Sequence, residues 1–312
     1  MMKGLLLGIL ISVFCIQNSQ SQARLTIPSD AQQVLFLGNS ITYAGKYIAY
    51  VETCYRLKNP DSTIEWINLG LPSETVSGLS EEGHANGEFP RPDLHERLSR
   101  VFASLDPDVV FFNYGMNDGI YLPFDMGRFQ LYQDGINWLY GEIESINAIP
   151  VALTPPVFDP NKGIDYSQVL DVYSDWLISK RGSDSWEVID IHGPMREYLA
   201  KERRKHADFF LAKDGVHPGD EGHWLMAREF LESLGWEKSS QSKSFEHLTK
   251  SFPQASKLLE LITKKQIIQR DAFLRETKHL RPGLAEGLPM DEAERQILEL
   301  EEEILSLLNS DK

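Results

Sequence analysis

The sequence predicts a layered α/β domain built on a mostly parallel sheet, followed by a helical extension. Two observations predict the α/β domain. Short apolar runs alternate with longer segments of helical periodicity between residues 32 and 234, and each apolar run ends in glycine, proline or polar residues. A third observation predicts the extension, because a serine- and lysine-rich linker at residues 238–244 precedes helical patterns.

The apolar runs are of a length typical of buried strands. They are residues 34–37, 64–69, 109–114, 151–153 and 188–191. Between them, apolar residues recur every three or four positions, which indicates helices. These helices are expected at residues 45–57, 94–105, 128–146 and 166–179, with another beginning near residue 220. Glycine, proline and charge mark a long loop at residues 77–93.

The amino end predicts export. A lysine precedes an apolar run at residues 4–16, and a polar stretch with small residues follows it. The run is shorter than the about 20 residues that span a membrane, so we expect a signal peptide at residues 1–23 and a periplasmic or extracellular protein. A retained membrane anchor is the main alternative. Lipid attachment at Cys15 is disfavoured by the bulky Phe14.

We expect the α/β domain to occupy residues 24–236 and the extension to occupy residues 237–312. Residues 254–280 and 291–308 are expected to form a helical hairpin packed on the α/β domain, because the second helix has one apolar face. The turn between them, R-P-G-L-A-E-G-L-P at residues 281–289, could either only connect the helices or reach over the carboxyl edge of the sheet.

Composition excludes several classes of partner. The formal charge of -15 argues against binding to nucleic acid or to an anionic membrane, both of which attract basic surfaces. Cys54 is the one cysteine beyond the signal peptide, so an internal disulfide is excluded, and we expect it to be a buried residue on a helix. The histidines lack the spacings of metal ligands, so we expect no metal and no cofactor.

The first strand ends in a segment that suggests nucleophilic chemistry. It reads V-L-F-L-G-N-S-I-T, which places the Ser40 hydroxyl at the carboxyl edge of the sheet, where such domains bind ligands. Serine is a poor nucleophile until a base takes its proton. The best candidate is His217 in D-G-V-H-P, where Asp214 is close enough to orient the imidazole ring. A surface turn is the structural alternative for this segment.

Acyl transfer also needs hydrogen-bond donors for the oxyanion. The turn G-M-N-D follows the third strand, so the Asn117 amide can point across the same edge, and the Ser40 backbone N–H is a second donor. The structural alternatives are that Asn117 only forms its turn and that Ser40 only caps a helix.

Four segments together resemble the SGNH hydrolases, also called GDSL-type esterases and lipases. They are G-N-S-I-T, N-L-G-L-P-S-E-T, G-M-N-D and D-G-V-H-P, in that order at successive strand ends and near the end of the domain. The resemblance implies a three-layer sandwich. It also implies that Ser40 is the nucleophile, that His217 and Asp214 complete a triad, and that Asn117 is an oxyanion donor. Longer stretches of sequence around these segments are similar to an exported bacterial subgroup of the family, whose substrate is uncharacterised.

Two positions depart from the family pattern. Asn39 stands where many members have aspartate, and Ser73 stands where a glycine usually gives its backbone N–H to the oxyanion hole. A serine keeps this N–H, provided that the backbone there does not require a positive φ. Arg91 and His95 are candidates to bind a carboxylate, a sulfate or a sugar hydroxyl, with structural or solvated roles as the alternative.

We therefore expect a serine esterase that hydrolyses acyl esters, acetyl above all, on a small molecule or polysaccharide. We expect the alcohol part of the ester to be a carbohydrate because of the predicted export, the acidic charge and the substrates that are common in the family that the sequence resembles. A lipase or phospholipase is the second enzyme hypothesis, and an acetyl transferase would use the same triad. The alternative that is not an enzyme is a carbohydrate-binding protein that kept the fold without catalytic activity.

Overall fold

A computed structural model describes residues 25–236 and 239–309. Its centre is a sheet in the order β2-β1-β3-β4-β5, with every neighbouring pair parallel. The strands are β1 (Gln33–Gly38), β2 (Glu65–Asn68), β3 (Val109–Asn113), β4 (Ile149–Leu153) and β5 (Glu187–Ile189). The predicted α/β fold is confirmed, and its sheet is wholly parallel.

The predicted signal peptide falls on residues 1–23, outside the described residues. Among the helices that the structure does describe, none combines the length and the apolar character needed to cross a bilayer.

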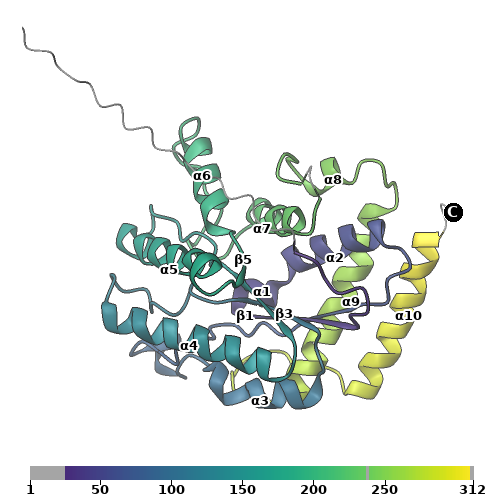
Figure 1. Ribbon diagram of the computed structural model, residues 1–312, viewed down its shortest axis with the longest axis horizontal. Coiled ribbons are helices and arrows are strands. Elements are labelled where there is room, and N and C mark those ends of the chain that lie inside the picture. The colour runs from purple at the N-terminus through teal and green to yellow at the C-terminus, as the bar shows by residue number, and fades with distance from the viewer. Residues whose placement is uncertain (1–24, 237–238, 310–312) are drawn as a thin grey trace, which may run out of the picture.

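Helices cover both faces of the sheet (Figure 1). They are α1 (Ser40–Ala44), α2 (Lys46–Lys58), η1 (His84–Gly87), α3 (Leu94–Ser104), α4 (Met126–Ser145), α5 (Ile164–Ser183), α6 (His192–Arg203), α7 (Asp220–Ser233), α8 (Phe245–Leu248), α9 (Ala255–Glu276) and α10 (Met290–Asn309). In Figure 1, α2 and α7 lie on one face and α3 and α4 on the other.

Helix α6 was not expected from the sequence. Its first turn contains Gly193 and Pro194, and this pair reads as a turn in a sequence. Proline is compatible with the first turn of a helix, however, because the N–H that it lacks has no partner there.

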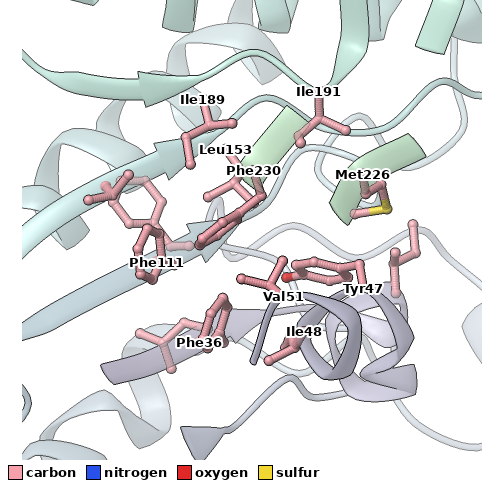
Figure 2. Close-up of a cluster of buried hydrophobic side chains, with 14 of the residues drawn as sticks. Phe36, Tyr47, Ile48, Val51, Phe111, Leu153, Ile189, Ile191, Met226 and Phe230 are labelled. Atoms are coloured by element: carbon pink, nitrogen blue, oxygen red, sulfur yellow. The ribbon is translucent and has the colours of Figure 1, made fainter. Parts of the chain in front are cut away.

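An aromatic cluster fixes α2 and α7 on the sheet (Figure 2). Phe36 of β1 and Phe111 of β3 stack with ring centroids 5.1 Å apart, and Phe230 of α7 lies 4.5 Å from Phe111. Tyr47 of α2 meets Phe36 edge-on at 6.3 Å. All these rings are buried, and burying such a side chain stabilises a fold by about 1.5–3 kcal/mol. The cluster therefore anchors the two helices that follow Ser40 and His217 in the chain.

Strand order changes direction at β1. The chain passes from β1 to β2 on one side and then returns to β3 on the other, so the loops after β1 and β3 leave from adjacent strands. The pairing of these two strands ends at Gly38 and Asn113. This is the position at which open α/β sheets form a crevice for ligands.

Beyond the linker, α9 and α10 pack against each other and run side by side (Figure 1). Helix α9 also contacts α2 and the edge strand β2, where Gln269 donates to the Glu65 carboxylate at 2.6 Å. A helix over an edge strand protects its unpaired backbone groups from other chains. Cys54 is buried in α2, and burial raises the pKa of its thiol.

A buried charge network joins α9 and α10 to α2. Glu52 of α2 is fully buried, and its carboxylate accepts from Lys265 Nζ at 2.6 Å and from Gln266 Nε2 at 2.6 Å. Arg56 donates to Glu52 at 3.1 Å and also to Glu301 of α10, which Lys265 reaches at 3.2 Å. Two buried cations thus balance the buried Glu52 and the partly exposed Glu301.

Removal of one cation should leave this network uncompensated. We expect Lys265→Met to lower the free energy of unfolding by about 3 kcal/mol, because breaking a buried ion pair leaves a charge without its partner. Lys264→Met is the control, since Lys264 is exposed on the same helix and should change stability by less than about 0.5 kcal/mol. Equilibrium denaturation in urea measures both. Equal stabilities for the two variants would contradict the prediction.

Candidate active site

Ser40 is held at the start of α1 by the sharp exit from β1. Asn39 caps this helix, because its side-chain oxygen accepts from the Ile41 N–H at 3.0 Å. Gly38 is required by close packing, since a Cβ there would lie 2.3 Å from Thr42 Oγ1. The cap needs only a side-chain oxygen, so asparagine serves here as aspartate would. The Ser40 backbone N–H is in the first turn, where it has no helical partner.

Ser40, His217 and Asp214 form one hydrogen-bonded chain. Ser40 Oγ lies 2.8 Å from His217 Nε2, and His217 Nδ1 lies 2.6 Å from Asp214 Oδ2. The other Asp214 oxygen accepts from the backbone N–H groups of Val216 and His217 at 2.9 and 2.8 Å. Gly215, directly after Asp214, has φ +92°, a conformation that favours glycine. The turn therefore holds the carboxylate and the imidazole ring in one orientation.

The Asp214 carboxylate is ionised at neutral pH. Partial burial raises its pKa, but hydrogen bonds from the His217 ring and from the His217 and Val216 backbone outweigh this effect and lower the pKa to about 2. A carboxylate beside Nδ1 favours the tautomer that carries its proton there. Nε2 then has a free lone pair toward the Ser40 hydroxyl, the arrangement in which histidine can take a proton from serine.

Asn117 projects from the loop after β3, and its side chain is buried. Its Nδ2 donates to the Glu74 carbonyl at 3.1 Å, and its Oδ1 accepts from the Tyr121 hydroxyl at 3.0 Å. An amide has two N–H groups, so one remains available for another acceptor. Asp118 braces the same loop, since its carboxylate accepts from the Gly115, Val76 and Ser77 N–H groups at 2.7 to 2.9 Å.

Ser73 occupies a left-handed backbone position. Leu71 to Glu74 form a turn closed by a 3.2 Å bond from the Glu74 N–H to the Leu71 carbonyl, with Pro72 second and Ser73 third. Ser73 has φ +70°, as a type II turn requires at its third residue. The condition stated from the sequence is therefore not met, because the backbone does adopt a positive φ. Serine nevertheless occupies the position, and its N–H has no partner among the described residues.

Comparison with known proteins identifies the family of the chain. Residues 36–225 match the model of the GDSL-like Lipase/Acylhydrolase family. The chain belongs to this family. It is therefore an SGNH-type hydrolase acting on carboxylic esters, as the four sequence segments predicted.

Individual relatives of this SGNH hydrolase are distant. An acetylxylan esterase from Geobacillus stearothermophilus is 23% identical over 228 residues, which cover 66% of this chain and 95% of that protein. The crystal structure of a catalytic mutant of an acetylxylan esterase from the same organism, 23% identical, has a TM-score of 0.54 and covers 68% of this chain and 97% of its own. A gut microbial diltiazem-metabolizing enzyme, 20% identical, also has a TM-score of 0.54, covering 69% of this chain and 49% of its own.

Two of the predicted site residues do not join the hydrolase's serine, histidine and asparagine. Arg91 is buried, and its guanidinium donates to the Glu81 carboxylate and the Ser73 carbonyl. His95 bonds to Asp93 at 2.7 Å and stacks on Trp138 at 3.8 Å. Both side chains are therefore engaged in contacts within the protein.

A buried network around Glu74, in the loop after β2, was not anticipated from the sequence. Glu74 is fully buried, and it accepts from Arg97 at 2.5 and 2.8 Å and from the Tyr114 hydroxyl at 2.6 Å. Burial raises the pKa of Glu74, although the Arg97 charge opposes this. The three residues are 17 to 40 positions apart, and no local pattern signals their contact.

The surface around the triad is open. Asp214 and His217 have side chains 55% and 54% exposed, and with Lys213 they line a cavity of about 450 Å³. A larger polar groove of about 1110 Å³ lies elsewhere, along α6 and α7. No group of three or more His, Cys, Asp or Glu suited to a metal ion occurs in the described residues.

Relief of the strain at Ser73 should stabilise this hydrolase. We expect Ser73→Gly to raise the free energy of unfolding by about 1 kcal/mol, because a left-handed φ costs a residue with a Cβ about 1–2 kcal/mol more than glycine. Ser77→Gly in the same loop is the control. Ser77 has no positive φ, so glycine there should lower stability. Denaturation in guanidinium chloride measures both, and a loss of stability in Ser73→Gly would contradict the expectation.

Proposed function

We propose that this protein is an exported serine esterase that removes acetyl groups from a carbohydrate. The observation that carries the proposal is the continuous hydrogen-bonded chain from Ser40 through His217 to Asp214, beside unpaired N–H donors. The similar acetylxylan esterase supports the choice of an acetylated sugar as substrate class. The predicted signal peptide supports a site of action outside the cytoplasm.

In the proposed reaction, Ser40 Oγ attacks the ester carbonyl while His217 Nε2 takes the hydroxyl proton. The Asp214 carboxylate stabilises the imidazolium that forms. The C–O bond to the sugar then breaks, and His217 gives its proton to the leaving alcohol. Water, activated by the same histidine, attacks the acetyl-serine and releases acetate.

The proposed oxyanion donors come from three loops. They are the Ser40 backbone N–H, the Ser73 backbone N–H and the remaining N–H of the Asn117 amide. The bond between Asn117 Nδ2 and the Glu74 carbonyl supports this grouping, because Glu74 directly follows Ser73. Each such donor typically contributes a factor of about 10²–10³ to the rate.

The open surroundings favour a small acyl group on a large alcohol. The cavity beside His217 is lined by Lys213, Asp214 and His217, all polar. A long acyl chain gains binding energy only from an apolar pocket, at about 0.8 kcal/mol for each buried CH₂. A half-exposed histidine, in contrast, leaves space for a bulky leaving alcohol above it.

One observation favours a lipase-type enzyme as the second candidate. The segment after Asn117 exposes the large apolar side chains of Leu122, Phe124 and Met126, which are 43% to 65% exposed. Exposed apolar residues in one segment can bind an acyl chain or an interface. The two candidates differ in how the rate depends on the length of the acyl chain.

Replacement of the nucleophile should abolish hydrolysis. We expect Ser40→Ala to lower kcat on 4-nitrophenyl acetate and on acetylated xylo-oligosaccharides by at least about 10⁴-fold, because loss of a triad member has effects of this size. The melting temperature should change little. Ser104→Ala, at an exposed serine of α3, is the control and should keep full activity. Substantial hydrolysis by pure Ser40→Ala protein would overturn the assignment.

Activity should not rise with the length of the acyl chain. We expect kcat/KM on 4-nitrophenyl esters to fall from acetate to butyrate to octanoate. An apolar acyl pocket would instead raise it by about fourfold for each methylene buried, the equivalent of about 0.8 kcal/mol. Initial rates below the critical micelle concentration give this series. A steady rise to octanoate would favour the lipase-type candidate.

A further inference from the structure

Arg91 lies between the two loops that carry Ser73 and Asn117. Its side chain is 5% exposed, and its Nε and Nη2 both donate to the Glu81 carboxylate at 2.6 Å. A two-point contact of this kind fixes the plane of a guanidinium as well as its position. The Glu81 carboxylate therefore balances the charge of Arg91 within the loop. The pairing also fixes the orientation of the guanidinium and so the position of its remaining nitrogen.

The backbone around Arg91 is also constrained. Arg91 stands between Pro90 and Pro92, each of which fixes its own φ. Its N–H donates to Ser80 Oγ at 2.9 Å, and the Pro92 carbonyl accepts from the Thr75 N–H at 3.0 Å. The segment that carries Arg91 is thus joined directly to the chain just after Ser73.

The remaining nitrogen of Arg91 reaches the loop that carries Ser73. Nη1 donates to the Ser73 carbonyl at 3.3 Å. Ser73 is the residue whose left-handed φ is strained for serine, and it needs contacts that hold its peptide units in place. The contact with Arg91 is one of these.

The guanidinium of Arg91 also contacts the loop that carries Asn117, through Tyr121. Its guanidinium carbon lies 5.2 Å from the centroid of the Tyr121 ring. The Tyr121 hydroxyl donates to Asn117 Oδ1 at 3.0 Å, and burial raises the pKa of this hydroxyl to about 12, so it keeps its proton. Tyr121 and Ile120 before it have φ values of +57° and +48°, which a stabilising contact must maintain.

We infer that Arg91 is a positioning residue that aligns the Ser73 N–H and the Asn117 amide as donors to the oxyanion. It acts on one donor through the Ser73 carbonyl and on the other through Tyr121. A substrate-binding role, as expected from the sequence, would require a free guanidinium. The inference depends on the proposed function, because it concerns the same oxyanion.

Steady-state kinetics on 4-nitrophenyl acetate test this role. We expect Arg91→Ala to lower kcat by about 10- to 100-fold, less than full removal of two donors, with KM changed by less than about threefold. Arg91→Lys keeps the charge but cannot make the same planar contacts, so it should recover only a small part of the rate. Arg100→Ala is the control. Arg100 bonds to Glu96 and the Thr277 carbonyl, away from both donors, and its loss should leave kcat unchanged.

A double-mutant cycle separates positioning from a general loss of structure. Arg91→Ala should cost several-fold less in the Asn117→Ala background than in the wild type, because one of the donors it aligns is already gone. Tyr121→Phe, which removes only the hydroxyl, should lower kcat by about tenfold at unchanged KM. Melting temperatures are measured for every variant, and rates are compared well below the lowest of them.

The outcomes are distinct. Unchanged kcat in Arg91→Ala, or equal effects in both backgrounds, would overturn the inference while leaving the esterase proposal intact. A raised KM with unchanged kcat would identify Arg91 as a substrate ligand and would also overturn it. Activity retained by Ser40→Ala would instead overturn the proposed function itself.

Discussion

The structure depends on the pairing of β1 with β3, which ends at Gly38 and Asn113. Because these strands are neighbours in a parallel sheet, the two loops that follow them emerge side by side from the same edge. The sheet itself is buried and apolar, and the aromatic cluster of Phe36, Phe111 and Phe230 holds it against α2 and α7. The buried sheet therefore sets where the loops of Ser40 and Asn117 begin relative to each other.

A site of this kind has to keep some N–H groups unpaired in order to use them. The loops cannot then be held by those groups, and other bonds must order them. The structure uses buried charged side chains for this purpose. Asp118 accepts from N–H groups of the loops after β2 and β3. Arg97 donates to Glu74, and Arg91 connects the two loops. A buried charge without a partner is costly, so conformations of the loops that break these pairs are disfavoured. When all the pairs form, the network makes the loops rigid.

Much of the fold could be predicted from the sequence because its signals are local. Apolar runs and helical periods gave the α/β class, which the structure and the family match confirm. Ser40, Asp214 and His217 could be selected because each lies in a short segment with its own turn chemistry, and their roles stay predictions. Arg91 and His95 were harder, because each has a partner far away in the chain, the Ser73 carbonyl for Arg91 and the Trp138 ring for His95. The Ser73 carbonyl is 18 residues from Arg91, and nothing near either residue indicates that they meet.

The same distinction explains the extension. The pair Glu52 and Arg56 is visible in the sequence as a helical spacing of four, but Lys265, which completes it, is 213 residues from Glu52. The extension also touches helix α1, which begins at Ser40. Arg270 of α9 donates to the Tyr43 carbonyl at 2.6 Å and lies 3.7 Å from the centroid of the Tyr43 ring, three residues after Ser40. The family match ends at residue 225, before α9 begins. Helix α1 is only five residues long, too short to be stable alone, so a helix from outside the matched region supports the element that presents Ser40.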